Sequence, residues 1–162
     1  NTVVGAFRYA AVLAFVAIAV LLAVLLRRPG DVALVFAPLV LAALLTVAAS
    51  VLFGLPFNFA NVIVLPLLFG LGVANGIHLV LRRRDEGGVT EVMASSTPRA
   101  VVFSTLTTIG SFSSIALSSH PGTASMGKLL TIAIALTLAC TLIVLPALMA
   151  LSEERREDIR AP

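Results

Sequence analysis

The stretch from Gly70 to His78, Gly-Leu-Gly-Val-Ala-Asn-Gly-Ile-His, places an amide, an imidazole and several glycines within an otherwise apolar run. Polar groups at the depth of a bilayer are costly, and they usually face a bundle interior, a cavity or a transport path. Closely spaced glycines let a neighbouring helix approach, or let their own helix loosen. Gly70, Gly72 and Gly76 are therefore predicted helix-packing positions, and Asn75 and His78 are candidates for lining a polar pathway.

Hydroxyl side chains are concentrated in a later apolar run: they are Ser104, Thr105, Thr107, Thr108, Ser111, Ser113 and Ser114. Ser104, Thr108 and Ser111 follow the i, i+4, i+7 spacing of one helical face. Hydroxyls in membrane helices often bond back to carbonyls of their own helix, or serve as small packing residues. A water-lined or proton-relay role for the set is the alternative.

The two polar groups are expected to meet across antiparallel helices. Ala74 and His78 are four residues apart and share a helical face, with Asn75 beside them. Opposite chain directions then bring His78 near Ser104. An imidazole suits proton exchange near neutral pH, although a position one turn from Arg82 also fits a membrane interface. The candidate proton-relay or transport path comprises Asn75, His78, Ser104, Thr105, Thr108 and Ser111.

The composition indicates lipid as the solvent of the chain. Of 162 residues, 59% are hydrophobic and 12% are charged, and the mean hydropathy is +1.09. A soluble domain of this length could not bury so much apolar side chain, because about half of a small domain stays at the surface. Since the chain opens on Asn1 rather than Met, we expect a fragment or a processed piece.

Several function classes are not expected. The net charge of +3 comes from arginines at the ends of apolar runs, which fits membrane topology better than nucleic-acid binding. The sequence contains no catalytic signature of the hydrolase, metalloprotease, P-loop or dinucleotide-binding kind, so we expect neither an enzyme nor a cofactor. Cys140 stands alone, which excludes a disulfide or a cysteine-based metal cluster within the chain, and no metal is expected.

The apolar runs predict an all-α membrane protein, with residues 1–162 forming a single five-helix transmembrane bundle. A span needs about 20 predominantly apolar residues. The predicted spans are residues 7–26, 32–52, 61–81, 100–117 and 126–151. Pro38, Pro66 and Pro146 fall inside spans and should kink or loosen their helices.

The positions of the arginines predict the orientation. We expect three regions to be cytoplasmic: the Arg27-Arg28 turn, the Arg82-Arg83-Arg84 loop with Arg99, and the tail of residues 152–162. The opposite loops, near residues 53–60 and 118–125, contain no Lys or Arg, and only Arg8 and Lys128 are discordant. The polar segment 85–98 should form a cytoplasmic surface helix or a linker. Thr90 would cap this helix, Val89, Val92 and Met93 would face the membrane surface, and Pro98 would end it.

These features resemble the resistance-nodulation-division (RND) transporter superfamily. The resemblance is carried by the glycine-rich pattern ending at His78, by the hydroxyl-rich run after Thr97-Pro-Arg99, and by the ending Leu145-Pro-Ala-Leu148. It covers nearly all of residues 3–151 and corresponds to the last five helices of a twelve-helix transporter. The segment from Phe53 to Asn61 is most similar to the hopanoid-biosynthesis-associated branch, which is related to the mycobacterial membrane large-protein lipid exporters.

The resemblance implies a multi-pass inner-membrane exporter that uses protons to move hopanoids or similar lipophilic molecules towards the outer membrane. Its partners would be the lipid substrate, membrane lipids and the remainder of the transporter. That remainder would comprise seven further helices and two periplasmic domains, and the full-length protein would be a homo-oligomer. Two related alternatives are a non-pumping, sterol-sensing type of lipid module and a protein-translocation auxiliary of the same superfamily. An inert packing bundle is a further alternative.

The family comparison singles out position 74. Lipid-exporting members commonly have Gly-x-Gly-x-Asp here, so the proton-accepting acid would fall on the position that Ala74 occupies. An alanine cannot exchange a proton. Either this half of the transporter is naturally without the acid, or position 74 was substituted to disable transport.

Overall fold

The computed structural model describes the backbone of residues 2–55 and 61–160, and their side chains except those of residues 2–4, 6–8, 10, 11, 62 and 156–160. All regular structure in this part of the chain is helical, which confirms the predicted all-α membrane bundle. The elements in chain order are α1 (Thr2–Leu26), α2 (Pro29–Leu52), η1 (Asn61–Ile63), α3 (Val64–Glu86), α4 (Val89–Ala94), α5 (Thr97–Ala116), α6 (Pro121–Ala139), η2 (Cys140–Val144) and α7 (Leu145–Arg160).

Three helical stretches among the described residues are long and apolar enough to cross a membrane: Pro29–Leu52, Val64–Glu86 and Pro121–Arg155. They coincide with the second, third and fifth predicted spans. α1 contains a shorter apolar stretch, Val12–Leu26, and α5 owes its lower hydropathy to its hydroxyls. Helices therefore occupy the regions of all five predicted spans, while the membrane-crossing role of α1 and α5 stays a prediction.

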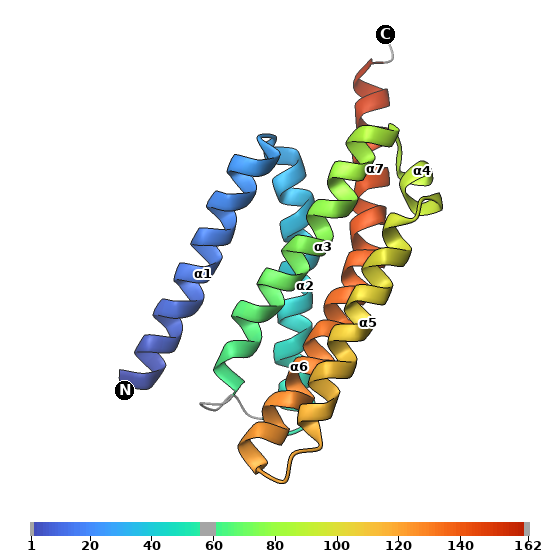
Figure 1. The fold of residues 1–162 in the computed structure, drawn as a ribbon. Helices are drawn as coiled ribbons and strands as arrows, with labels where there is room; N and C mark the ends of the chain where they lie inside the picture. The colour runs from blue at the N-terminus through green and yellow to red at the C-terminus, as the bar shows by residue number, and fades with distance from the viewer. Residues whose placement is uncertain (1, 56–60, 161–162) are drawn as a thin grey trace.

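The long helices form one elongated bundle (Figure 1). α2, α3 and α6 pack against one another, α1 packs on α2 and α3, and α5 packs along α6. The larger group of buried apolar side chains includes Leu22, Leu26, Val35, Leu39, Val73, Leu79, Val80, Val92, Leu145 and Met149. A second group joins α3 to α6 and comprises Val64, Leu68, Leu129, Leu130 and Ala133.

Two of the three predicted packing glycines lie at close contacts between helices. A Cβ atom added at Gly72 would lie 2.8 Å from Cγ2 of Thr137 and 2.9 Å from Cδ1 of Leu39. One added at Gly76 would lie 3.0 Å from Cγ1 of Val35, whereas one added at Gly70 would meet nothing within 4 Å. α3 is continuous through all three positions. The packing role is thus seen at Gly72 and Gly76 but not at Gly70, and the alternative of a loosened helix is not seen.

The predicted loosening of the helix at Pro146 takes the form of a π-helical turn, Cys140–Val144, directly before α7. Proline lacks the N–H that would bond to the carbonyl four residues earlier, and a π turn is one way to absorb this break. α2 continues through Pro38. Pro66 lies in the first turn of α3, where a helix leaves its N–H groups unpaired in any case.

The short helix α4 corrects the prediction for residues 85–98. It begins at Val89 with Gly88, not Thr90, at the N-cap, and it ends at Ala94. Val92 is buried in the larger apolar group and Val89 packs against it, so these two side chains face the bundle, whereas Met93 is exposed as predicted. Pro98 lies in the first turn of α5 instead of ending α4, because a proline is tolerated at the start of a helix.

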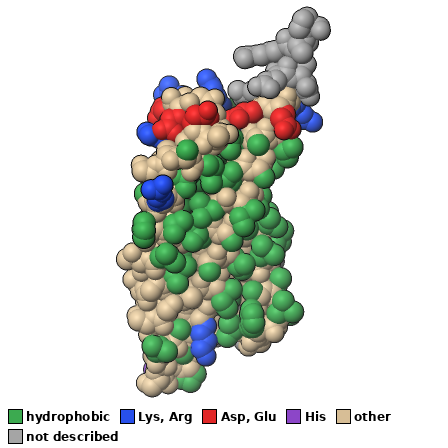
Figure 2. Space-filling view, turned by 90° about the vertical axis from the view of Figure 1, so that its right-hand side faces the viewer, with side chains coloured by type: hydrophobic (Ala, Val, Ile, Leu, Met, Phe, Trp, Pro, Cys, Tyr) green, Lys and Arg blue, Asp and Glu red, His purple; other side chains and the backbone are tan. Residues whose placement is uncertain are grey.

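One end of the bundle gathers most of the charged side chains. The α1–α2 turn, the end of α3, α4 and the end of α7 all lie there (Figure 1). Figure 2 shows acidic and basic groups gathered at this end, above a flank where hydrophobic side chains are interspersed with other surface. This arrangement places Arg27, Arg28, Arg82–Arg84 and Arg99 at the same end, as the topology prediction requires. The opposite loop around residues 56–60, and the side chains of Arg8, Arg156 and Arg160, lie outside the described residues.

Replacing Gly72 by leucine should lower the stability of the bundle by about 2 kcal/mol, because the side chain would displace Thr137 and Leu39 from packed positions. Gly70→Leu is the matched control, and it should be neutral or slightly stabilising because glycine is a poor helix former. Denaturant unfolding of the purified protein in detergent measures both. Equal effects at the two positions would contradict the packing role of Gly72.

Candidate functional site

α3 has two opposite faces with different tasks. Gly72 and Gly76 lie one turn apart on the face that packs against α2 and α6. Ala74 and His78 are offset from them by two residues, or about 200° around the helix, and therefore lie on the other side. Both are exposed, while Asn75, between the two faces, is half-buried. The close packing of one face leaves the other free to line a cavity.

A cavity of about 430 Å³ lies between α3 and α5. It is lined by Leu71, Ala74, Asn75, His78, Ser96, Thr97, Ala100, Val101 and Ser104. The structure therefore brings His78 and Ser104 to one site, as the antiparallel arrangement predicts. It also places position 74 on the wall of the same cavity.

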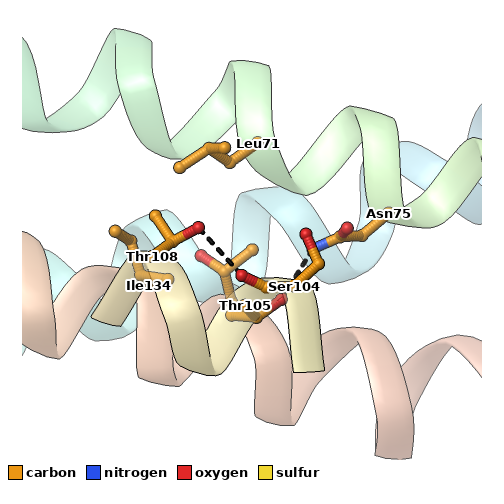
Figure 3. Close-up of a pocket in the computed structure, with 7 residues that line it drawn as sticks. Leu71, Asn75, Ser104, Thr105, Thr108 and Ile134 are labelled. Atoms are coloured by element: carbon orange, nitrogen blue, oxygen red, sulfur yellow. Dashed lines mark hydrogen bonds between the residues drawn. The ribbon is translucent and has the colours of Figure 1, made fainter. Parts of the chain in front are cut away.

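A smaller polar cavity adjoins the first and involves Asn75 again (Figure 3). Nδ2 of Asn75 donates a hydrogen bond to Oγ1 of Thr105 across 3.2 Å, which joins α3 to α5. Thr105 is buried, with 5% of its surface exposed. The space of about 20 Å³ is enough for a single water molecule, which needs roughly 10–15 Å³ by the same measure. It is lined by Leu71, Asn75, Ser104, Thr105, Thr108, Ile134 and Thr137.

Other hydroxyls of α5 bond within their own helix. Oγ1 of Thr108 donates to the carbonyl of Ser104 at 3.0 Å, and Oγ of Ser111 donates to the carbonyl of Thr107 at 3.0 Å. Thr108 still lines the smaller cavity, whereas Ser111 lines neither cavity. The predicted stripe is therefore divided: Ser104 and Thr108 lie at the site, and Ser111 lies beyond it.

Three further polar residues, Thr137, Ser96 and Thr97, line the site although the sequence did not predict them there. Thr137 comes from α6 and is buried, and its hydroxyl donates to the carbonyl of Ala133 at 2.7 Å. No spacing rule within one helix connects it to Asn75, because the contact depends on how α6 packs against α3. Ser96 and Thr97 lie where α5 begins, and the sequence placed them in the polar segment 85–98 that connects two spans.

The arrangement can hold water but carries little charge of its own. Among the residues that line the two cavities, His78 is the titratable group, and the others offer neutral donors, acceptors or apolar walls. Within the part of the chain that the structure describes, no group of three or more His, Cys, Asp or Glu side chains could hold a metal ion. The lining of the two cavities thus offers an amide, several hydroxyls and one imidazole as polar groups.

The fold and this site define a helical membrane bundle with a polar cavity between two of its helices. Comparison with known proteins shows which transporters the chain is similar to. The chain is 48% identical over 149 residues to the hopanoid transporter HpnN of Rhodopseudomonas palustris, an alignment that covers 92% of the chain and 17% of that protein. It is 42% identical over 156 residues to the hopanoid transporter HpnN of Burkholderia multivorans, covering 96% of the chain and 18% of that protein. These similarities support the predicted resemblance of the segment to the hopanoid-associated branch of the RND superfamily.

A more distant relative is a protein of Methanocaldococcus jannaschii described as a membrane protein. It is 28% identical over 145 residues, which are 85% of the chain and 37% of that protein. No family model matches the chain. The chain thus spans less than a fifth of the length of the two transporters that it resembles.

The Asn75–Thr105 bond should be measurable as a coupling between α3 and α5. In a double-mutant cycle of Asn75→Ala and Thr105→Val, we expect a coupling free energy of about 0.6 kcal/mol, a typical value for interhelical hydrogen bonds in membranes. Unfolding of the four proteins in detergent measures it.

Thr107 provides the control for this cycle, because its hydroxyl donates to the carbonyl of Phe103 in its own helix. Thr107→Val should therefore show no coupling with Asn75→Ala. Equal coupling of Asn75 to both threonines would argue against a specific contact with Thr105.

Proposed function

We propose that this chain is the transmembrane module of a proton-driven inner-membrane exporter that moves hopanoids or similar lipophilic molecules towards the outer membrane. The observation that carries the proposal is the polar cavity between α3 and α5 in a segment related to two hopanoid transporters. The transporter names support the substrate class. The cavity supports a place where protons could cross.

Position 74 is the proposed proton-binding position of this half of the transporter. It lies on the cavity wall with Asn75, His78 and Ser104. A carboxylate there would be surrounded by an amide, a hydroxyl and an imidazole, and groups that hydrogen-bond to or pair with the charged form favour it. Ala74 offers no such group, so His78, the titratable residue among those that line the cavity, is the proposed proton carrier there.

The remainder of the transporter would cover the outer side of α5. Ser104, Thr107, Ser111 and Ser114 are exposed there, beside Phe103 with 70% and Leu106 with 50% of their surfaces exposed. Hydroxyls at bilayer depth favour protein or water over lipid as neighbours. Seven further helices and two periplasmic domains would provide these contacts and capture the substrate, and the full-length protein would form a homo-oligomer. The arginine-rich end and the C-terminal tail would be cytoplasmic.

Ala74→Asp in the full-length transporter should raise lipid-dependent proton flux, because it supplies the missing exchangeable group at the cavity. Proteoliposomes with an imposed pH gradient and an internal pH-sensitive dye measure the flux. Ala74→Asn is the matched control: it has nearly the same size and polarity but exchanges no proton, and it should leave the flux unchanged.

An unchanged flux in Ala74→Asp would mean that proton binding belongs to another part of the transporter, and it would contradict the role proposed for position 74. Absence of lipid movement in every variant and in the unmodified transporter would instead favour the non-pumping, lipid-sensing alternative.

A further inference from the structure

A buried carboxylate lies at the charged end of the bundle, away from the cavity between α3 and α5. Asp31 is in the first turn of α2, and only 2% of its surface is exposed. Its place near the start of a helix is favourable, since the helix dipole stabilises negative charge there. Burying a carboxylate is nevertheless costly unless it is paired and hydrogen-bonded. The partners of Asp31 therefore indicate what it holds together.

Two arginines from the last turn of α3 pair with this one carboxylate. NH2 of Arg83 donates to Oδ1 of Asp31 at 3.1 Å. Arg84 donates to Oδ2 from Nε at 2.9 Å and from Nη2 at 2.5 Å, and such charge-assisted hydrogen bonds are stronger than neutral ones. The side chains of Arg83 and Arg84 are 10% and 26% exposed, so water screens these pairs less than it would at a surface.

The same arginines extend the contact to two more helices. NH1 of Arg83 donates to Oγ of Ser152 in α7 at 2.9 Å. NH2 of Arg84 donates to the carbonyl of Leu26, the last residue of α1, at 2.5 Å. We call Asp31, Arg83, Arg84, Ser152 and the Leu26 carbonyl the Asp31 cluster. It joins α1, α2, α3 and α7 at one point.

Arg82, the neighbouring arginine, lies outside the Asp31 cluster. Its NH2 group pairs with Oε1 of Glu86 one turn later in α3 at 2.5 Å, and its side chain is 43% exposed. An exposed pair of this kind within one helix contributes little. Arg82 therefore offers a charge at the same helix end that does not tie α3 to another helix.

The cluster is mechanically connected to the polar site through α3. Position 74 precedes Arg83 by nine residues, or about 14 Å along a continuous helix. Gly72 and Gly76 keep α3 close to α2 without side chains of their own to interlock with it. The Asp31 cluster supplies a polar contact between α3 and α2 that fixes how far α3 can slide or rotate.

We propose that Asp31 is a positioning residue that sets the placement of α3, and thereby the access of water to position 74. The effect of this role on transport rests on the proposed function, but the effect on the placement of α3 does not. When Asp31 is replaced by the neutral asparagine, Arg83 and Arg84 lose their shared counter-ion and repel each other. The end of α3 is then released from α2, and the cavity between α3 and α5 widens. With Arg84 neutral, the Asp31–Arg83 pair persists, so the effect is smaller.

Cysteine labelling of the full-length transporter in nanodiscs tests this role. Ala74→Cys in a cysteine-free background, with Cys140→Ala, is labelled by a water-soluble maleimide. Asp31→Asn should raise the labelling rate about fivefold or more, the factor that corresponds to roughly 1 kcal/mol. Arg84→Gln should raise the labelling rate less than Asp31→Asn does. Asp31→Glu keeps the negative charge, so its labelling rate should stay closer to that of the parent. Arg82→Gln, the matched control, should leave it unchanged.

The order of the labelling rates among these variants tests whether Asp31 positions α3. Parent-like labelling in both Asp31→Asn and Arg84→Gln would overturn the proposal, as would an equal rise in Arg82→Gln. If Asp31→Asn does not fold, Arg84→Gln and Asp31→Glu still provide the comparison. Because labelling requires no lipid movement, a failure of the proposed transport function leaves this test intact. Where transport is measured, Asp31→Asn should lower the maximal rate and Asp31→Glu should restore it.

Discussion

The close approach of α3 to α2 and α6 is the constraint on which the rest of the structure depends. At Gly72 and Gly76 there is no room for a Cβ atom without displacing Thr137, Leu39 or Val35. This contact fixes one face of α3, and helical geometry then directs Ala74 and His78 to the opposite side. The cavity between α3 and α5 follows from that division, because α5 packs along α6 and its Ser104 lines the cavity opposite Ala74 and His78.

The polar groups of α3 and α5 differ in the hydrogen bonds that they make. Thr107 and Ser111, which line neither cavity, donate to carbonyls of α5, and this lowers the cost of a hydroxyl in an apolar environment. Asn75 instead bonds across to Thr105, and an amide retains further donors and acceptors for water. Ala74 lines the same cavity but offers no polar side chain, and the proposed function assigns the missing carboxylate to this position.

Apolar length was enough to predict the five helical regions, since it depends on local sequence. The glycine spacing predicted packing at Gly70, Gly72 and Gly76 alike, and only the arrangement of α2 and α6 shows that Gly72 and Gly76 make the close contacts. Helical periodicity also brought His78 and Ser104 together, because antiparallel neighbours pair predictably. Contacts between distant helices were beyond such rules. Thr137 lies at the site only because α6 packs against α3. Asp31 in the charged turn is a buried partner of Arg83 and Arg84, which the sequence predicted only as charges of a cytoplasmic loop. The burial of Val92 of α4 in the larger apolar group likewise depends on side chains from distant helices.

The central claim, that protons drive lipid movement through the transporter containing this segment, is tested most directly by hopanoid transfer in proteoliposomes. The full-length transporter would be reconstituted with a labelled hopanoid, and transfer to acceptor vesicles would be followed with a pH gradient imposed and with the same gradient collapsed by a protonophore. The account predicts that transfer depends on the gradient and falls to the protein-free rate when it is collapsed. Equal transfer under both conditions would contradict it.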